Sequence, residues 1–261
     1  MTVEIFNFWH LFWAIFYVVA TVGLYRLFKD KSRRTQRLLI YGLILLNFFF
    51  HFTVPILTQD SPERFIRAVS LSNICAAIVL MSPFVYWQRD HFLKPGWLYV
   101  SIIAGLAILV NPTDALGRPS FELDVLRFFI QHWLIFVVPV LLISFDHESL
   151  RWQDLWTTPV LMTFIVAMVI TNAAILQVLG VIPDMRATNA SFQWRPAELE
   201  SALGWMVPSA FTRIPFGAEA GEATHWPLIY KLPTYFVLGP ILTALINGVN
   251  IAFRRFRNVQ L

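Results

Sequence analysis

Long stretches without a charged residue dominate the chain. A helix that crosses the hydrocarbon core of a bilayer needs about 20 mostly apolar residues, and helix is expected there because backbone polar groups must be satisfied within the segment. The pattern predicts an all-α polytopic integral membrane protein, a seven-transmembrane-helix bundle forming one membrane domain over residues 1–261. The seven stretches are Ile5–Tyr25, Leu38–Gln59, Ala68–Gln88, Pro95–Thr113, Phe128–Phe145, Leu155–Pro183 and Leu232–Phe253.

The longest segment between these stretches is Asp184–Lys231, which is rich in Pro, Gly and Trp. It contains a short helix candidate, Pro196–Trp205. Its tryptophans, Trp194, Trp205 and Trp226, are typical of the membrane–water interface. We expect residues 184–231 to be an extracytoplasmic loop, either lying over the membrane face as a lid or forming a plain surface loop.

Composition supports a membrane protein. Of the 261 residues, 57% are hydrophobic and 14% are charged, against about 25% charged in soluble domains. A soluble globule and a disordered chain are therefore excluded. The net charge of +4 does not indicate a nucleic-acid partner, because the basic residues stand at the ends of apolar stretches. Cys75 is the single cysteine, which excludes an internal disulfide and a multi-cysteine metal site.

The basic residues also predict orientation. They concentrate in the first turn, Arg26–Arg37, and recur at Arg89, Lys94 and Arg151 and in the segment 254–257. Short loops rich in Lys and Arg face the cytoplasm. The N-terminus is therefore expected outside and the C-terminus in the cytoplasm.

Polar residues within the apolar stretches are candidates for function, because they are costly in a membrane. Cys75 follows Arg67 by eight residues, and His132 follows Asp124 by eight. At 1.5 Å of rise per helical residue, both would lie about 12 Å below the outer surface. Three more polar residues fall in the same outer half: His10, His51 and Asn172. Taken alone, each of these residues is explained by a hydrogen bond to a backbone carbonyl or to a neighbouring helix, without a role in a site.

A cysteine and a histidine at one depth suit acyl transfer. A thiolate is the nucleophile, and a histidine about 3 Å away takes its proton and later protonates the leaving alcohol. Amide or imidazole donors would stabilise the oxyanion. A site within the membrane opens toward acyl chains, so a lipid ester is the expected substrate.

Two segments carry a family resemblance. Residues 69–77 read Val69-Ser-Leu-Ser-Asn-Ile-Cys-Ala-Ala, and residues 126–133 read Leu126-Arg-Phe-Phe-Ile-Gln-His-Trp. They resemble the YwaF-like family of seven-helix bacterial membrane proteins, whose third helix carries a Pro-Leu-His-Leu-Cys-Asp type motif and whose fifth carries Phe-Phe-x-x-His. Other pieces agree in order: Phe8-Trp9-His10, Phe50-His51, Asn111-Pro-Thr-Asp114, Thr171-Asn172, Arg195-Pro196, Trp226-Pro227 and Tyr230.

This family is similar to an animal transmembrane lysophospholipid acyltransferase that works without coenzyme A through a Cys and a His. The resemblance implies a phospholipid acyltransferase of the bacterial plasma membrane, acting on phospholipids and lysophospholipids with no cofactor and no metal. Cys75 would be the nucleophile and His132 the base and acid. The supporting or substrate-binding donors would be Asn73, His51, His10 and Asn172.

The sequence departs from the family motif at two positions beside the cysteine. Asn73 stands where the family has His, and Ala76 stands where it has Asp. An alternative is therefore a non-enzymatic accessory or structural subunit with membrane-protein partners. Another is a metal-dependent lipid hydrolase whose zinc ligands would be His10, His51, His132 and Cys75, although no HxxxH pair supports it.

Overall fold

The computed structural model describes residues 2–88, 92–110, 112, 114–183 and 232–259, and this part of the chain is helical. The predicted loop or lid, Asp184–Lys231, lies outside the described residues. The elements are α1 Phe8–Phe28, α2 Arg33–Thr58, α3 Pro62–Val69, α4 Ile74–Trp87, α5 Leu93–Val110, α6 Leu123–Ser144, the 3-10 helix η1 Trp152–Trp156, α7 Thr157–Val178 and α10 Leu232–Val259.

The predicted membrane fold is confirmed. Among the described residues, six helices are long and apolar enough to cross a membrane. A further span forms if α3 and α4 are taken together, with a bend of 64° between them. The chain is therefore an all-α polytopic membrane protein with six or seven candidate spans. Its orientation, with the N-terminus outside, stays a prediction.

The third apolar stretch is not one helix, so the prediction of an uninterrupted helix over Ala68–Gln88 is wrong. The chain turns between α3 and α4, and Asn73 caps α4 by accepting the Ala76 N–H at 2.8 Å. An asparagine at this position favours the start of a helix. The prediction did not include this start, because the stretch was defined only by its lack of charged residues. Cys75 is therefore the second residue of α4, and its depth cannot be counted along one helix from Arg67.

The N-terminal residues also depart from the predicted stretch. The first helix begins at Phe8 rather than Ile5, because Asn7 caps it by accepting the His10 N–H at 3.0 Å. The buried Val3 pairs with the loop before α6, donating to the Arg118 carbonyl at 2.9 Å and accepting from Gly117 at 2.9 Å. Gly117 has a φ of +74°, which glycine adopts without strain. The N-terminus is thus held at the end of the bundle where α6 begins.

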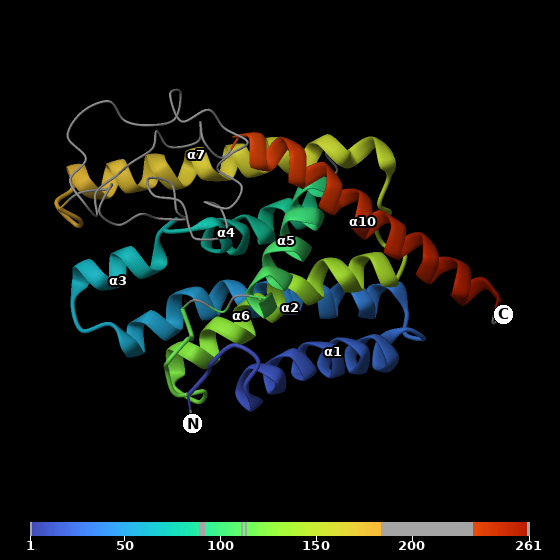
Figure 1. Ribbon diagram of the computed structural model, residues 1–261, viewed down its shortest axis with the longest axis horizontal. Coiled ribbons are helices and arrows are strands. Elements are labelled where there is room, and N and C mark those ends of the chain that lie inside the picture. The colour runs from blue at the N-terminus through green and yellow to red at the C-terminus, as the bar shows by residue number, and fades with distance from the viewer. Residues whose placement is uncertain (1, 89–91, 111, 113, 184–231, 260–261) are drawn as a thin grey trace.

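The helices form a layered bundle with α5 and α6 at its centre (Figure 1). The α1 helix lies along one side, and α7 and α10 lie along the opposite side. The central pair packs closely: a Cβ at Gly105 would lie 2.6 Å from the Cβ of Phe136 on α6. Small residues allow such close approach between membrane helices. Most side chains of α1 and α10 are not buried within the protein, as expected of helices that face lipid.

Candidate functional site

A cavity of about 360 Å³ opens at one end of the bundle. Its walls come from the end of α2, the α3–α4 junction, the loop before α6 and the first half of α6. It combines charged, amide and apolar groups with the single cysteine. The lining residues are His51, Gln59, Ala68, Ser72, Asn73, Cys75, Ala76, Val79, Asp114, Arg118, Asp124, Arg127, Phe128, Gln131, His132 and Ile135.

One face of α6 supplies the largest share of this lining. Its contributions are spaced alternately three residues and one residue apart, which is the spacing of a single helical face. The face begins with charge, passes through amide and imidazole, and ends in an aliphatic side chain. In order, the residues are Asp124, Arg127, Phe128, Gln131, His132 and Ile135.

The ring of His132 is oriented by its own helix. Its Nδ1 lies 2.7 Å from the backbone oxygen of Phe128. A carbonyl oxygen only accepts hydrogen bonds, so the Nδ1 atom carries the proton. In the neutral ring, Nε2 therefore keeps its lone pair and can act as a base.

The second imidazole of the cavity, His51, holds α2 to the end of α3. Its Nε2 donates to the Val69 carbonyl at 2.9 Å, and the side chain is buried. By the same reasoning its Nδ1 has the lone pair. His51 therefore has both a structural bond and a place in the cavity lining.

The cysteine lies at the start of α4. Cys75 is half-buried with a free thiol, and Asn73 beside it is exposed. The Asn73 side-chain oxygen caps the helix, so its amide nitrogen is the group left to face a ligand. The first N–H groups of a helix lack partners within it and carry partial positive charge. This end of α4 suits a developing negative charge.

Two predicted site residues do not line the cavity. Both ring nitrogens of the buried His10 bond to backbone: Nδ1 accepts the Phe6 N–H, and Nε2 donates to the Leu109 carbonyl, each at 3.0 Å. Asn172 donates to the Ser70 hydroxyl at 3.3 Å and so joins α7 to the α3–α4 turn. The cavity thus brings together Cys75, His132, Asn73 and His51, but neither His10 nor Asn172.

The four-ligand zinc arrangement considered from the sequence is not assembled. His10 is engaged by backbone on both nitrogens. Across the described part of the chain, no group of three or more His, Cys, Asp or Glu side chains is placed to hold a metal ion.

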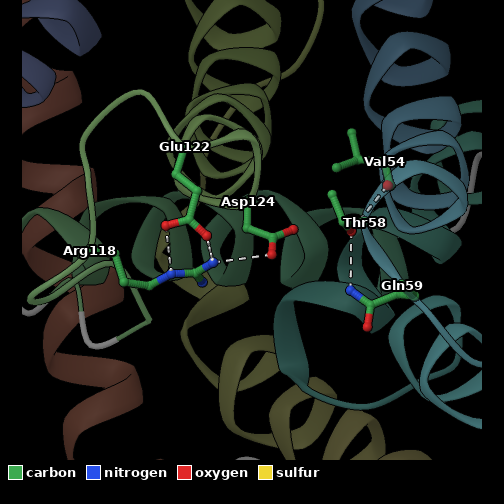
Figure 2. A network of polar contacts seen from close by, with 6 residues as sticks. All are labelled: Val54, Thr58, Gln59, Arg118, Glu122 and Asp124. Atoms are coloured by element: carbon green, nitrogen blue, oxygen red, sulfur yellow. Dashed lines mark hydrogen bonds and ion pairs between the residues drawn. The ribbon is translucent and has the colours of Figure 1, made fainter.

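The charged lining residues Arg118 and Asp124 were not predicted as part of the site from the sequence. Figure 2 shows the Arg118 guanidinium donating to the carboxylate of Glu122 and, at 3.2 Å, to that of Asp124. The bond to Glu122 is the main reason that the pKa of Arg118 is raised. Opposite, at the end of α2, the Gln59 amide donates to the Thr58 hydroxyl at 3.1 Å (Figure 2). The sequence held one signal for this polar lining, the helical spacing from Asp124 to Ile135. That spacing places the polar residues of this segment on the same helix face as His132.

Comparison with known proteins places these residues within one family. The sequence model of the TMEM164 family matches residues 5–216. The matched range contains every residue that lines the cavity. Neither the curated proteins nor the solved structures give a match.

Proposed function

The chain belongs to the TMEM164 family, and we propose that it is a membrane-embedded phospholipid acyltransferase that acts through a Cys–His thioester mechanism. The observation that carries this proposal is that Cys75 and His132 line one cavity from two different helices, α4 and α6. The resemblance to YwaF-like proteins and to the animal acyltransferase gives these two residues the same roles.

The reaction needs only groups of this cavity and two lipids. His132 Nε2 takes the proton of the Cys75 thiol, and the sulfur attacks the carbonyl carbon of a phospholipid ester. The C–O bond breaks, and His132 returns the proton to the leaving oxygen, which releases a lysophospholipid. A hydroxyl of an acceptor lysophospholipid then attacks the thioester. His132 takes the hydroxyl proton and passes it to the departing thiolate, so proton and acyl group both balance.

The oxyanion of each step would form next to the start of α4. The partial positive charge at this end of α4 would stabilise it, and the Asn73 amide nitrogen can donate to it; one good donor is worth roughly 3 kcal/mol. His10 and Asn172, which do not line the cavity, are assigned positional roles: His10 ties α1 to the end of α5, and Asn172 ties α7 to the α3–α4 turn.

The lining matches a lipid ester in polarity. Val79, Phe128 and Ile135 give an apolar surface for an acyl chain, whereas Arg118 and Arg127 bring cationic groups. A phospholipid presents the same pairing of apolar chain and charged head group.

The test uses purified full-length protein in detergent with labelled phosphatidylcholine and a lysophospholipid acceptor. We expect acyl transfer and an acyl adduct on the protein that hydroxylamine releases. Because Cys75 is the single cysteine, the adduct can be assigned, and Cys75→Ala should abolish both signals. Transfer that persists in Cys75→Ala would exclude the thioester. A wild type with neither signal, copurifying at fixed stoichiometry with another membrane protein, would favour the accessory subunit.

A further inference from the structure

Arg127 is a cation of the cavity that no carboxylate of the described residues contacts in an ion pair. Its Nε donates to the Gln131 side-chain oxygen at 3.0 Å, and within the described ranges it forms no ion pair. Arg118 on the same lining differs, because Glu122 and Asp124 both bond to it. A guanidinium has five N–H donors, so Arg127 has donors left for a ligand.

The two carboxylates on the lining do not change this. Asp124, one helical turn before Arg127, acts on it electrostatically but forms its ion pair with Arg118. Asp114 is exposed and has no ion pair with Arg127 among the residues that the structure describes. A cation within a membrane protein is costly unless an anion or polar group faces it. Gln131 is the polar partner that Arg127 has here, and the rest of its positive charge faces the cavity lining, where an anionic group from outside the chain can meet it.

Gln131 gives Arg127 a fixed orientation. Since arginine only donates, the Gln131 amide oxygen must face Arg127, and its Nε2 turns away. That nitrogen is buried and has no hydrogen-bond partner within the described structure. Asn47 of α2 donates to the Gln131 backbone oxygen at 3.3 Å. Gln131 thus holds the guanidinium in place through its side-chain oxygen.

We infer that Arg127 binds the phosphate of a phospholipid substrate, with Gln131 as the positioning residue. This inference rests on the proposed acyl-transfer function. A guanidinium matches a phosphate bidentately. Arg127 precedes His132 by five residues, which is about 7.5 Å along the helix axis. The phosphate and the ester carbonyl of a glycerophospholipid are separated by only a few bonds, so one lipid can reach both residues.

The test measures binding rather than turnover, in a Cys75→Ala background. Native mass spectrometry in detergent would compare lysophosphatidylcholine, a monoacylglycerol of the same chain length, and inorganic phosphate. We expect lysophosphatidylcholine to bind about tenfold more tightly than the monoacylglycerol, because charge-assisted bonds to phosphate are strong. Arg127→Gln should lose that preference and keep monoacylglycerol binding, which also reports that the variant is folded. Arg64→Gln, which removes an exposed arginine on α3, is the matched control and should keep the preference.

A second variant tests the same point with Arg127 in place. Gln131→Glu puts a carboxylate against the guanidinium and should weaken the head-group preference as Arg127→Gln does. An unchanged preference in folded Arg127→Gln, or in Gln131→Glu if the first variant does not fold, would overturn the inference. Competition by inorganic phosphate as strong as by the lysolipid would assign a free phosphate instead. If the preference for the phosphate head group is found but the wild-type protein, with Cys75 in place, transfers no acyl group, the proposed function is overturned and the phosphate-binding role of Arg127 stands.

Discussion

The Nδ1 atom of His132 lies 2.7 Å from the backbone oxygen of Phe128, one helical turn earlier on α6. The Phe128 ring lies beside the imidazole as well, with 4.6 Å between the ring centroids. A single residue of the same helix therefore fixes both the tautomer and the plane of the histidine. The base of the proposed reaction needs no carboxylate partner to be oriented.

His132→Ala should lower acyl transfer by about 10²-fold or more, because the proton acceptor is lost. The double variant with Cys75→Ala should lose no more than Cys75→Ala alone, since residues that act as one unit do not add. Initial rates of transfer from labelled phosphatidylcholine measure this. Losses that multiply would show that the two residues act separately.

His10→Phe should destabilise the protein without changing the specific rate of the folded fraction. The change leaves the Phe6 N–H and the Leu109 carbonyl without their partner. Phe6 is exposed, so the main cost is the unmet Leu109 carbonyl, about 1–3 kcal/mol. Thermal unfolding in detergent gives the stability, and acyl transfer per folded protein gives the rate. A stable His10→Phe protein with a lowered rate would assign His10 to the reaction.

The fold could be predicted because a bilayer imposes a strong length and charge condition on each span. Six of the seven uncharged stretches each overlap one long helix of the bundle, and the third overlaps the end of α3 and the whole of α4. The break before Ile74 could not be found by that criterion, because a turn of serines and asparagine is as uncharged as a helix. Its signals are local: Asn73 is a favoured cap, and Pro62 follows Ser61 at the start of α3.

The candidate site was predicted only in part, for a related reason. Depth along a helix was inferred from residue counts, and depth alone cannot tell which way a side chain faces. His10 and His132 both lie within helices, yet both ring nitrogens of His10 bond to backbone while His132 lines the cavity. Arg127 was passed over because it borders an uncharged stretch and was counted as its end.

Gly105→Ala should destabilise the bundle and slow the proposed reaction. A Cβ there would lie 2.6 Å from the Phe136 Cβ and 3.0 Å from the His132 backbone oxygen, so α5 and α6 must move apart beside the histidine. Overpacking of this kind costs about 1–3 kcal/mol. Gly42→Ala is the control, since a Cβ at that position would meet nothing within 4 Å beyond the local backbone of its own helix. Equal thermal stability of the two variants would contradict the close contact.

His147, in the loop after α6, should make the protein less stable in mild acid. Burial, and then the charges of Arg37 and Arg33, lower the pKa of His147, and neither ring nitrogen has a hydrogen-bond partner in the part of the chain described. Below about pH 6.5 the unfolded chain binds a proton that the folded protein resists, so stability falls with pH through that window.

His147→Leu should remove this part of the acid sensitivity, because leucine has no proton to bind. Unfolding temperatures of both proteins at about pH 7.5 and about pH 5, on either side of the ordinary histidine pKa, measure it. The variant should match or exceed the wild type at the lower pH. A parallel fall of both proteins would show that other groups cause the sensitivity.

The predicted orientation can be tested at the two ends of α2, where the described residues Lys31 and Asp60 are both exposed. Lys31 lies in the basic turn that the positive-inside rule places in the cytoplasm, and Asp60 follows the other end of the same helix, on the side of the cavity. In a Cys75→Ala background, Lys31→Cys should resist an impermeant thiol reagent in intact cells and react after lysis. Asp60→Cys should react in both conditions. The opposite pattern would invert the topology and place the cavity toward the cytoplasm, where its lipid substrates would come from the inner leaflet instead of the outer one.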